Sequence, residues 1–446
     1  MSGPLTTLDL RGTDTSDPHA LRKVLPRPKA AEEPPIEQVR DVIDQVRVGG
    51  DDALRELTAK FDGVNIDEVR VAPDVVASAP DRIAPALKAA LETAHANISA
   101  YHRAQVHDAA RYERDGLVVR ELRRPVDRAG LYVPSALAPL LSTALMTAVP
   151  AKVAGVPETV LCTAPGPDGL VDDGILAAAA IAGVDEVHRV AGPAAIAALA
   201  YGTDSIRPVD VIVGPGSARV AQAKREVASS GLVGVPSSFA GPSEVVVIAD
   251  ASAVTDDVAV DIVLQAEHGP DGLAWLICWD DDVRAAVDAA VARIVAASPR
   301  REHIEATLAD AGYAVVVDGP EAAVDVANVI APEHLEIQTA DPDALLDRVK
   351  HAGAVFCGPW APASVGDYVA GPNHVLPTYG SARFGGALRV DDFCKHVHVV
   401  SLDESALRSL APHVEAMAEA EGLAAHAQSV RQRVARPEGA PGDAGR

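Results

Sequence analysis

The sequence predicts an α/β protein with two open, Rossmann-like parallel-sheet domains and small segments at the N- and C-terminal ends. Three observations support this fold class. Short β-branched runs alternate with alanine-rich helical stretches, this alternation occurs in two separate series, and 446 residues exceed what one ordinary hydrophobic core contains. Strands connected in this way form parallel sheets with helices on their faces.

The expected elements follow in order along the chain. A helical region begins after Pro35, because apolar residues recur at three- and four-residue spacing from Val39 to Val46. The first series then comprises strands 160–163, 187–190 and 209–213 with helices 175–182, 194–201 and 218–228. The second series comprises strands 244–249, 275–278, 314–317, 335–338 and 354–357 with helices between them. A strand at 397–402 and a helical tail follow, and the Gly-, Pro- and Ala-rich end at 437–446 is expected to be disordered.

The charged residues of the chain limit the kinds of partner that it can bind. The chain has 39 Lys and Arg against 63 Asp and Glu, a formal charge of −24, which repels phosphate backbones and anionic membranes. We therefore expect no nucleic-acid partner and no membrane partner. Cys162, Cys278, Cys357 and Cys394 show no CxxC spacing, and no secretion-type segment opens the chain, so a cytoplasmic protein with reduced thiols is expected.

Gln265 and His268 lie three residues apart near the end of a helix predicted to begin at Thr255. Residues at this spacing share one helix face, so the amide oxygen and the imidazole could reach the same metal ion. The ordinary alternative is a polar pair on the surface near a helix end.

Glu333 and His334 follow Pro332, which discourages helix continuation, and directly precede the predicted strand 335–338. Strand ends of open α/β sheets are common ligand sites. Imidazole titrates near neutral pH and burial can raise the pKa of a carboxyl group, so the two side chains could supply two bases. The alternative is a solvated Glu-His corner.

Three further loops carry groups suited to binding. Asp367 and His374 lie in a Gly- and Pro-rich loop, where Asp367 could complete a nitrogen and oxygen set that suits zinc or could only cap a turn. The turn 214–217 follows a strand and precedes a helix, as phosphate-binding turns do, but it lacks the full G-x-G-x-x-G spacing and could be a plain tight turn. Ser243 offers a hydroxyl between the two series, with turn stabilisation as its alternative role.

Taken in order, these stretches resemble the histidinol dehydrogenase family, from about Arg40 to Arg433. The resemblance is densest at 241–250, 265–268, 331–340, 366–380 and 421–426. It implies a zinc- and NAD-dependent enzyme of histidine biosynthesis. Such an enzyme oxidises the amino alcohol L-histidinol through the aldehyde to L-histidine, and consumes two NAD. The resemblance also implies a homodimer with intertwined C-terminal tails.

The resemblance also implies a role for each matching residue. His334 would take a proton as hydride leaves the alcohol, and Glu333 would activate water for attack on the aldehyde. The implied zinc ligands are Gln265, His268, Asp367 and His426. The implied substrate contacts are Ser243, Gln265, His268, His334, Asp367, His374, Glu421 and His426. Glu421 and His426 would complete the site of the neighbouring subunit.

The departures from the family pattern lie mainly on the cofactor side. Tyr132 is kept as an implied cofactor contact, but Ser135 and Ala136 stand where the family usually has two glycines. At the other two implied cofactor positions, Ala194 replaces a glutamine and Ser217 an asparagine. Each lost amide hydrogen bond contributes about 1 kcal/mol, so we expect NAD binding to be weakened but not abolished. Arg219, where tyrosine is common, has a charge that would permit contact with the cofactor pyrophosphate.

The expected domain division has five parts. Residues 1–36 form an N-terminal segment, 37–130 with 244–385 form the first α/β domain with the zinc and catalytic loops, 131–243 form the NAD-side domain, 386–436 form a tail domain, and 437–446 form a disordered end. Two functional alternatives remain open: a paralogous zinc- and NAD-dependent dehydrogenase of another amino or hydroxy alcohol, and a non-catalytic protein that binds zinc and imidazole.

Overall fold

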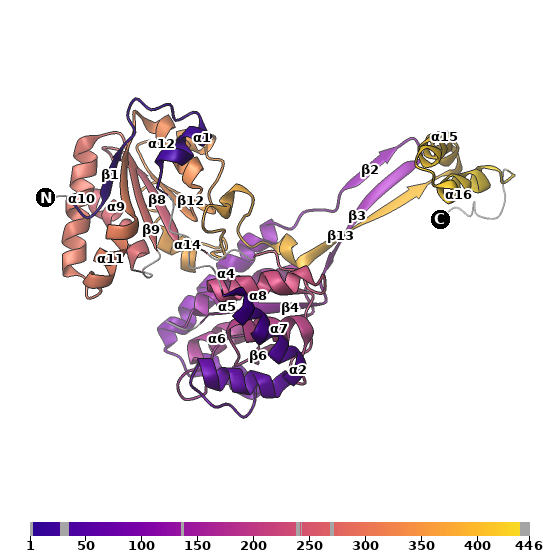
Figure 1. Ribbon diagram of the computed structural model, residues 1–446, viewed down its shortest axis with the longest axis horizontal. Helices are drawn as coiled ribbons and strands as arrows, with labels where there is room; N and C mark the ends of the chain where they lie inside the picture. The colour runs from indigo at the N-terminus through magenta and orange to yellow at the C-terminus, as the bar shows by residue number, and fades with distance from the viewer. Residues whose placement is uncertain are drawn as a thin grey trace. The chain divides into compact units, whose positions relative to one another are not determined.

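The computed structural model describes residues 3–26, 35–134, 138–237, 241, 243–267 and 272–437. The chain forms two compact units: unit 1 is Met1–Val106 with Val126–Phe393, and unit 2 is His107–Pro125 with Cys394–Arg446. Unit 1 contains two parallel sheets with their helices, and unit 2 contains a small antiparallel sheet with two helices (Figure 1). The predicted α/β class with two Rossmann-like sheets is confirmed.

The larger sheet of unit 1 has six parallel strands in the order β1-β10-β9-β8-β11-β12. Their bounds are β1 (Thr6–Asp9), β8 (Glu244–Ala249), β9 (Leu273–Cys278), β10 (Gly312–Val316), β11 (His334–Gln338) and β12 (Ala354–Cys357). The first strand of the second series, β8, lies centrally, with β9 and β10 on one side and β11 and β12 on the other, which is the doubly wound arrangement. The five strands predicted for this series are present close to their expected bounds. Residues 1–36 were expected to form a separate N-terminal segment. Instead, they contribute β1, which is an edge strand of this sheet.

Helices cover both faces of the six-stranded sheet. One face packs against α9 (Thr255–Ala266), α10 (Asp281–Ala297) and α11 (Arg301–Ala311), and the other against α1 (Pro18–Val24) and α12 (Pro320–Ile330). Successive strand residues point to opposite faces. Val245 and Val247 therefore belong to the α9 core, and Val246 and Ile248 to the α12 core. The same alternation places the side chain of Glu244 on the α12 face.

The smaller sheet of unit 1 has four parallel strands in the order β6-β5-β4-β7. The bounds are β4 (Arg128–Tyr132), β5 (Glu158–Cys162), β6 (Glu186–His188) and β7 (Val211–Val213). One face packs against α4 (Pro85–Ala104), α5 (Leu141–Ala154) and α6 (Asp173–Ile181), and the other against α2 (Ile36–Phe61), α7 (Gly192–Tyr201) and α8 (Ala218–Ser229). The short helices α3 (Pro73–Ser78) and η1 (Ala79–Asp81) pack on α6. The chain adds β5 and β6 on one side of β4 and then returns to add β7 on the other side. The adjacent strands β4 and β7 therefore flank a topological switch point.

The packing of α2 and α4 differs from the expected domain division, which grouped residues 37–130 with 244–385. The helix α2 packs on α7 and α8, and α4 packs on α5 and α6, so both cover the smaller sheet. Their apolar residues, such as Val46 and Ile98, belong to the two cores of that sheet. Sequence periodicity could not assign them, because it shows that a helix face is buried and not which sheet buries it.

Unit 2 has an antiparallel sheet in the order β13-β3-β2, with β2 (Arg111–Arg114), β3 (Leu117–Pro125) and β13 (Cys394–Leu402). The helices α15 (Glu404–Ala420) and α16 (Ala424–Val434) pack on each other. The predicted late strand and helical tail are therefore confirmed. Between β11 and this unit, unit 1 also contains α13 (Asp343–Leu346), α14 (Ala363–Tyr368), η2 (Ser381–Arg383) and η3 (Val390–Phe393).

Two expectations from composition are also addressed by the fold. Within the described ranges, no helix combines the length and apolar character that a bilayer crossing requires. The four cysteines are free thiols, with Cys162 and Cys278 buried and the other two half-buried. Burial raises the pKa of Cys278 to about 11, so this thiol is inert at neutral pH, as expected of a structural cysteine.

Candidate active site

The two predicted bases lie at the amino end of β11, beside the amino end of β8. The helix α12 ends at Ile330, Ala331 adopts a left-handed conformation with φ 55°, and Pro332 leads into the strand. His334 is then paired in register with Val245, so its side chain points to the α9 face. Ligands of open α/β sheets usually bind at the carboxyl ends of strands. The predicted bases therefore lie at a strand end, as expected, but at the amino end instead of the usual carboxyl end.

The side chains of Glu333 and His334 are buried, at 10% and 7% exposure. His334 Nδ1 lies 3.2 Å from the backbone oxygen of Glu244 and 3.7 Å from Glu333 Oε2. Its Nε2 lies 3.4 Å from Asp367 Oδ1, and Glu333 Oε2 accepts a hydrogen bond from the backbone N–H of Glu244 at 3.1 Å. The alternative of a solvated Glu-His corner is therefore wrong. If Nδ1 donates to the carbonyl of Glu244, Nε2 is the nitrogen left to exchange protons with a substrate.

The charges around His334 set its protonation. Burial lowers the pKa of His334, but the carboxylates of Glu333 and Asp367 outweigh this effect and raise it to about 9. Burial raises the pKa of Glu333, while the nearby charge of His334 opposes that rise. An imidazole between two carboxylates can hold and release a proton close to neutral pH once one carboxylate charge is offset.

The loop that carries Asp367 is held against β12. An added Cβ on Gly366 would lie 2.5 Å from the ring of Phe356, so only glycine allows α14 to approach the strand this closely. The backbone oxygen of Asp367 lies 2.8 Å from His374 Nδ1, and His374 Nε2 lies 3.2 Å from Thr143 Oγ1. The predicted loop pair is therefore brought together. Because its carboxylate faces His334, Asp367 does more than cap a turn.

Gln265 is buried near the end of α9, with only 2% of the residue exposed. Its Nε2 has no hydrogen-bond partner among the described residues. A surface role for this glutamine is therefore excluded, and an unpaired buried amide is the kind of group that a ligand satisfies. His268, its proposed companion, lies outside the described residues.

A buried carboxyl pair, which the sequence did not single out, connects the elements of this site. Asp261, one turn before Gln265 on α9, is hydrogen-bonded to Glu336 of β11. Glu336 is fully buried and also accepts a hydrogen bond from the backbone N–H of Ala363, the first residue of α14, at 3.0 Å. Burial and then the charge of Glu336 raise the pKa of Asp261 to about 8. The pair thus joins α9, β11 and α14. The sequence feature that could have revealed it is an acidic residue within the apolar pattern of α9 and of β11.

The donor set is compatible with zinc as far as the described residues extend. Gln265 offers the oxygen of a buried amide and Asp367 a carboxylate, and zinc accepts oxygen as well as nitrogen ligands. Of the other two expected ligands, His268 is not described and His426 belongs to unit 2. Accordingly, no set of three His, Cys, Asp or Glu side chains with metal-site geometry occurs within the described ranges.

A cavity of about 310 Å³ extends from Glu333 and His374 to the turn after β7. Ser243, Glu333 and His374 line it from the six-stranded side, and the turn 214–217 lines it from the four-stranded side. This volume is at the lower end of the range for small-molecule sites. One predicted base, Glu333, and the predicted phosphate-binding turn therefore face one space.

The turn after β7 passes very close to β4. Gly214 has φ 113°, and a Cβ there would lie 2.1 Å from the backbone oxygen of Tyr132, so glycine is required. Ser217 is the N-cap residue of α8 and makes no side-chain capping bond. The hydroxyl of Tyr132 accepts a hydrogen bond from the backbone N–H of Gly192, at the start of α7, at 3.2 Å. The turn is therefore at the carboxyl-end switch point, where nucleotides bind in such sheets.

A second cavity, of about 390 Å³, adjoins this turn and brings the substituted cofactor-side positions together. Its lining includes Ala194, Ser217 and Arg219. The sequence did not single out Lys224, which is buried on α8 and donates hydrogen bonds to the backbone oxygens of Gly214 and Ser237. Burial lowers the pKa of Lys224 to about 7. This lysine fixes the turn from behind.

The last two expected site residues belong to unit 2. Glu421 caps the end of α15, and His426 lies in the first turn of α16. Both are exposed. They are therefore presented together at the turn between two helices and are not part of the group assembled within unit 1.

Comparison with known proteins identifies the family. The histidinol dehydrogenase family profile matches residues 25–434. The chain is 44% identical to histidinol dehydrogenase of Symbiobacterium thermophilum over 435 residues, covering 96% of this chain and 98% of the relative. It is also 44% identical to histidinol dehydrogenase of Parasynechococcus marenigrum over 416 residues, covering 93% and 94%.

A solved structure gives the same result. The crystal structure of histidinol dehydrogenase from Elizabethkingia anophelis superposes with a TM-score of 0.92 at 31% identity, covering 97% of this chain and 99% of that one. The resemblance stated from sequence motifs is therefore confirmed over nearly the whole length. The chain belongs to the histidinol dehydrogenase family of NAD-dependent oxidoreductases.

Proposed function

We propose that this protein oxidises L-histidinol to L-histidine through the aldehyde, with zinc bound and with two NAD reduced per substrate. The observation that carries the proposal is the cavity of about 310 Å³, which joins Glu333 and His374 to a glycine turn at a nucleotide-type switch point. An alcohol oxidation needs a base, a hydride acceptor and a space that both can reach. Glu333 lines this cavity, and the side chain of His334 lies directly beside Glu333.

We assign proton transfer from the alcohol to His334. Its Nδ1 is held by the carbonyl of Glu244, which leaves Nε2 toward Asp367 and the substrate side. Neutral imidazole is the form that accepts a proton. Because the carboxylate of Asp367 helps to raise the pKa of His334, a cation held at Asp367 would lower that pKa toward neutrality.

We assign activation of water in the second oxidation to Glu333. Its carboxylate is buried, is anchored by the backbone N–H of Glu244 and lines the cavity. The pKa of Glu333 is raised, first by burial, which makes it a stronger base than an exposed glutamate. Ser243 also hydrogen-bonds to this carboxylate and so orients it.

Zinc, when bound, supplies a Lewis acid that orients the alcohol and stabilises its deprotonated form. We propose that Gln265, His268, Asp367 and His426 hold it. The burial of Gln265 near the end of α9 and the position of the Asp367 carboxylate beside His334 support the first and third of these assignments. His374 and Ser243, which line the cavity, and Glu421 are proposed to bind the polar groups of histidinol.

NAD supplies the hydride acceptor in both oxidations. We propose that it binds across Tyr132, Ala194 and Ser217. Support comes from the start of α7, where Gly192 donates to Tyr132, and from the cavity shared by Ala194, Ser217 and Arg219. The side chains of alanine and serine cannot supply the amide contacts of the residues they replace, and Arg219 could instead pair with the pyrophosphate.

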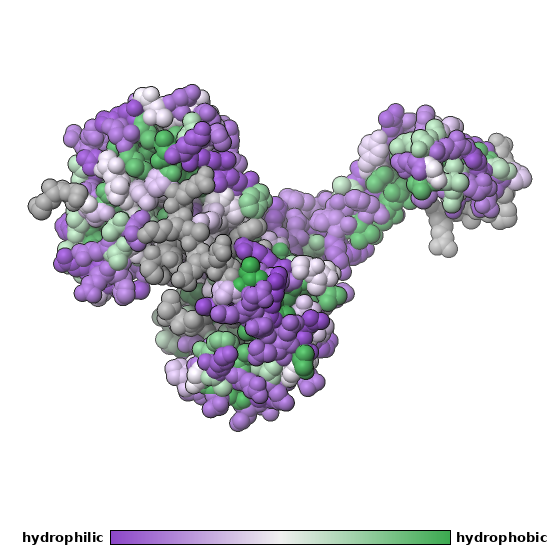
Figure 2. Space-filling model, viewed as in Figure 1, coloured by the Kyte–Doolittle hydropathy of each residue, from purple (hydrophilic) through white to green (hydrophobic). Residues whose placement is uncertain are grey.

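We further propose a cytoplasmic homodimer in which Glu421 and His426 complete the partner's site. Both residues are exposed on unit 2 and so are accessible to a second chain. The same unit exposes apolar side chains on β13 and on its helices: Val397, Val400, Leu402, Leu410, Val414, Met417 and Leu423. Figure 2 shows hydrophobic side chains among the polar ones on the visible surface of this unit. Such exposure is typical of a surface covered in an assembly.

The test is the yield of NADH when the zinc-loaded protein receives limiting L-histidinol and excess NAD. We expect two NADH per histidinol, with formation abolished by a chelator and restored by zinc. One NADH per histidinol would contradict the four-electron reaction. No NADH from folded, zinc-containing protein would favour a paralogue with another alcohol substrate, which a panel of amino and hydroxy alcohols would reveal, or a non-catalytic zinc- and imidazole-binding protein.

A further inference from the structure

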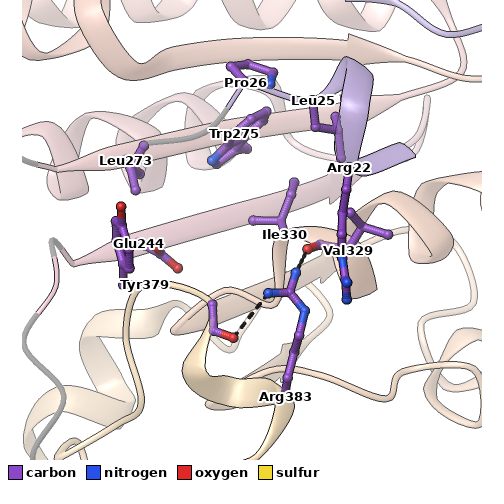
Figure 3. Close-up of a pocket in the computed structure, with 11 residues that line it drawn as sticks. Arg22, Leu25, Pro26, Glu244, Leu273, Trp275, Val329, Ile330, Tyr379 and Arg383 are labelled. Atoms are coloured by element: carbon purple, nitrogen blue, oxygen red, sulfur yellow. Dashed lines mark hydrogen bonds between the residues drawn. The ribbon is translucent and has the colours of Figure 1, made fainter. Parts of the chain in front are cut away.

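A cavity of about 400 Å³ lies on the α12 face of the six-stranded sheet, opposite the face toward which His334 points. We call it the Trp275 cavity. Its lining residues are Arg22, Leu25, Pro26, Glu244, Leu273, Trp275, Val329, Ile330, Tyr379, Gly380 and Arg383. In Figure 3, Arg22 and Arg383 lie at one side of the cavity and Glu244 and Leu273 at the other. Its volume is within the range of small-molecule sites.

Two buried polar atoms of this cavity have no hydrogen-bond partner among the described residues. One is the indole Nε1 of Trp275, and the other is Oε2 of Glu244. Both residues are only 2% exposed. The indole ring is held in place by Tyr313, with ring centroids 4.4 Å apart. Buried polar groups are nearly always paired, so two unpaired atoms on one cavity wall indicate a binding site for a polar ligand or for ordered water.

The cavity is positively charged, although the whole chain has a formal charge of −24. The charge of Arg22 contributes to lowering the pKa of Arg383, after the larger effect of burial. The pKa of His351 is also lowered, first by burial and then by the charges of Arg383, Lys350 and Arg22. Two guanidinium groups, those of Arg22 and Arg383, therefore line the cavity, and no described carboxylate pairs with Arg22.

The carboxyl group in the cavity does not cancel this charge. Burial and then the charge of Glu333 raise the pKa of Glu244 to about 8, so Glu244 is mostly protonated at neutral pH. A protonated carboxyl donates a hydrogen bond instead of repelling an anion. The remaining walls are apolar, formed by Leu25, Leu273 and the end of α12.

The two guanidinium groups differ in what they can bind. Arg383 already donates to the backbone oxygens of Val329 and Gly380 (Figure 3). Arg22 is exposed at the rim and makes no hydrogen bond or ion pair within the described part of the chain. One available guanidinium fork matches one carboxylate in a bidentate pair, and the apolar walls match a hydrocarbon or aromatic body.

We propose that the Trp275 cavity binds a small amphipathic monocarboxylate, with its carboxylate on Arg22 and its apolar body against Trp275 and Leu273. The site is separate from the proposed histidinol and NAD sites, because its side chains occupy the other face of the sheet. It adjoins the catalytic pair at Glu244, whose backbone contacts both Glu333 and His334.

The test uses 3-phenylpropanoate, which has an aromatic body and a carboxylate but no amine or imidazole to chelate a metal. Ligand-observed NMR titration of the zinc-loaded protein would measure its binding. The uncharged 3-phenylpropanol is the matched probe. Arg22→Gln removes the fork, and Lys23→Gln, which is also exposed on α1 but lies outside the cavity lining, is the matched variant.

We expect saturable binding of 3-phenylpropanoate to the wild type and to Lys23→Gln, and about ten-fold weaker binding to Arg22→Gln. 3-Phenylpropanol should bind about ten-fold more weakly than the acid. The KM for L-histidinol should be the same in all three proteins, which separates this site from the proposed active site. Absence of binding to the wild type would mean that the cavity holds only water, and equal binding to Arg22→Gln would mean that the acid binds without Arg22. Either result would overturn the proposal.

Discussion

The two sheets of unit 1 have the same type of strand order, but their candidate sites lie at opposite ends of the strands. We call these ends the carboxyl edge and the amino edge of each sheet. In the four-stranded sheet, Tyr132 and the turn that ends at Ser217 lie at the carboxyl ends of β4 and β7. In the six-stranded sheet, Glu244 and His334 lie at the amino ends of β8 and β11. Fold topology alone would assign a nucleotide site correctly in the first sheet and would misplace the catalytic site in the second.

The difference has a local cause at the carboxyl edge of the six-stranded sheet. Asp250 follows β8, and its carboxylate accepts hydrogen bonds from the backbone N–H groups of Ser252 and Ala340 at 2.8 and 3.0 Å. This ties the turns after β8 and β11 together at the place where a ligand crevice would otherwise open. At the amino edge, by contrast, Glu333 and His334 meet the loop of Asp367. The position of a ligand site therefore depends on which strand ends the loops leave open, and not on the strand order of the sheet.

The largest expected effect comes from removing a base at the amino edge of the six-stranded sheet, where we place the catalytic group. Glu333→Gln keeps the size of the side chain but removes the base that we assign to water activation. We expect turnover to fall about 10²- to 10⁴-fold. In a single turnover with excess NAD, the NADH yield should fall from two toward one per histidinol, because only the aldehyde step needs water. A yield that stays at two would remove Glu333 from this role.

The carboxyl edge of the smaller sheet should respond differently. Arg219→Ala removes a cation from the cofactor cavity, and we expect NAD to bind about ten-fold more weakly, with a reduced dependence on salt. Arg225→Ala, on the exposed side of the same helix, is the control. Fluorescence titration with NADH measures both variants. Equal affinities in the two variants would show that Arg219 does not contact the cofactor.

Restoring the family residues at the same edge should have a smaller effect. Ala194→Gln and Ser217→Asn each reintroduce an amide worth about 1 kcal/mol, so each should tighten NAD binding about five-fold. The KM for L-histidinol should not change, because these positions lie outside the catalytic group. If neither variant tightens NAD binding, the substitutions are already compensated in the native cavity.

The last prediction concerns the carboxyl pair of Asp261 and Glu336 and changes stability, not catalysis or NAD binding. The pKa of Asp261 is raised to about 8 in the folded protein, so the folded chain binds one more proton than the unfolded chain between about pH 4 and pH 8. Its stabilising contribution is present at low pH and is lost as the pH rises through 8. Asp261→Asn should remove this dependence, which is at most about 1.4 kcal/mol per pH unit.

Urea unfolding at several pH values between 5 and 8 measures this effect. The free energy of unfolding of the wild type should fall with rising pH more steeply than that of Asp261→Asn. Asp282→Asn, exposed in the first turn of α10, should behave like the wild type. Parallel curves for the wild type and Asp261→Asn would show that Asp261 and Glu336 do not share a proton.

Much of the fold could be predicted because β-branched runs and helical periodicity are local signals. The strand β12, for example, has the predicted bounds. The contribution of β1 to the six-stranded sheet and the packing of α2 on the four-stranded sheet were not predictable in this way. Both depend on contacts between residues distant in sequence, which a periodic pattern does not encode.

The candidate site was only partly readable from the sequence for a related reason. Glu333, His334 and Asp367 were found by their chemical types and motif order, and the structure brings them together. Glu244 and Asp261 were missed because an isolated acid in an apolar stretch reads as a surface residue until burial is known. Their function depends on which neighbours they face, and that is a tertiary property.

The most direct test of the division between the two edges is the NAD affinity and the first-turnover rate of His334→Asn, measured with zinc bound. We predict an NAD affinity equal to that of the wild type and a first hydride transfer slowed at least about 100-fold, because the base lies at the amino edge of the other sheet. Weakened NAD binding with an unchanged first turnover would contradict this account, since it would place His334 with the cofactor and remove it as the base.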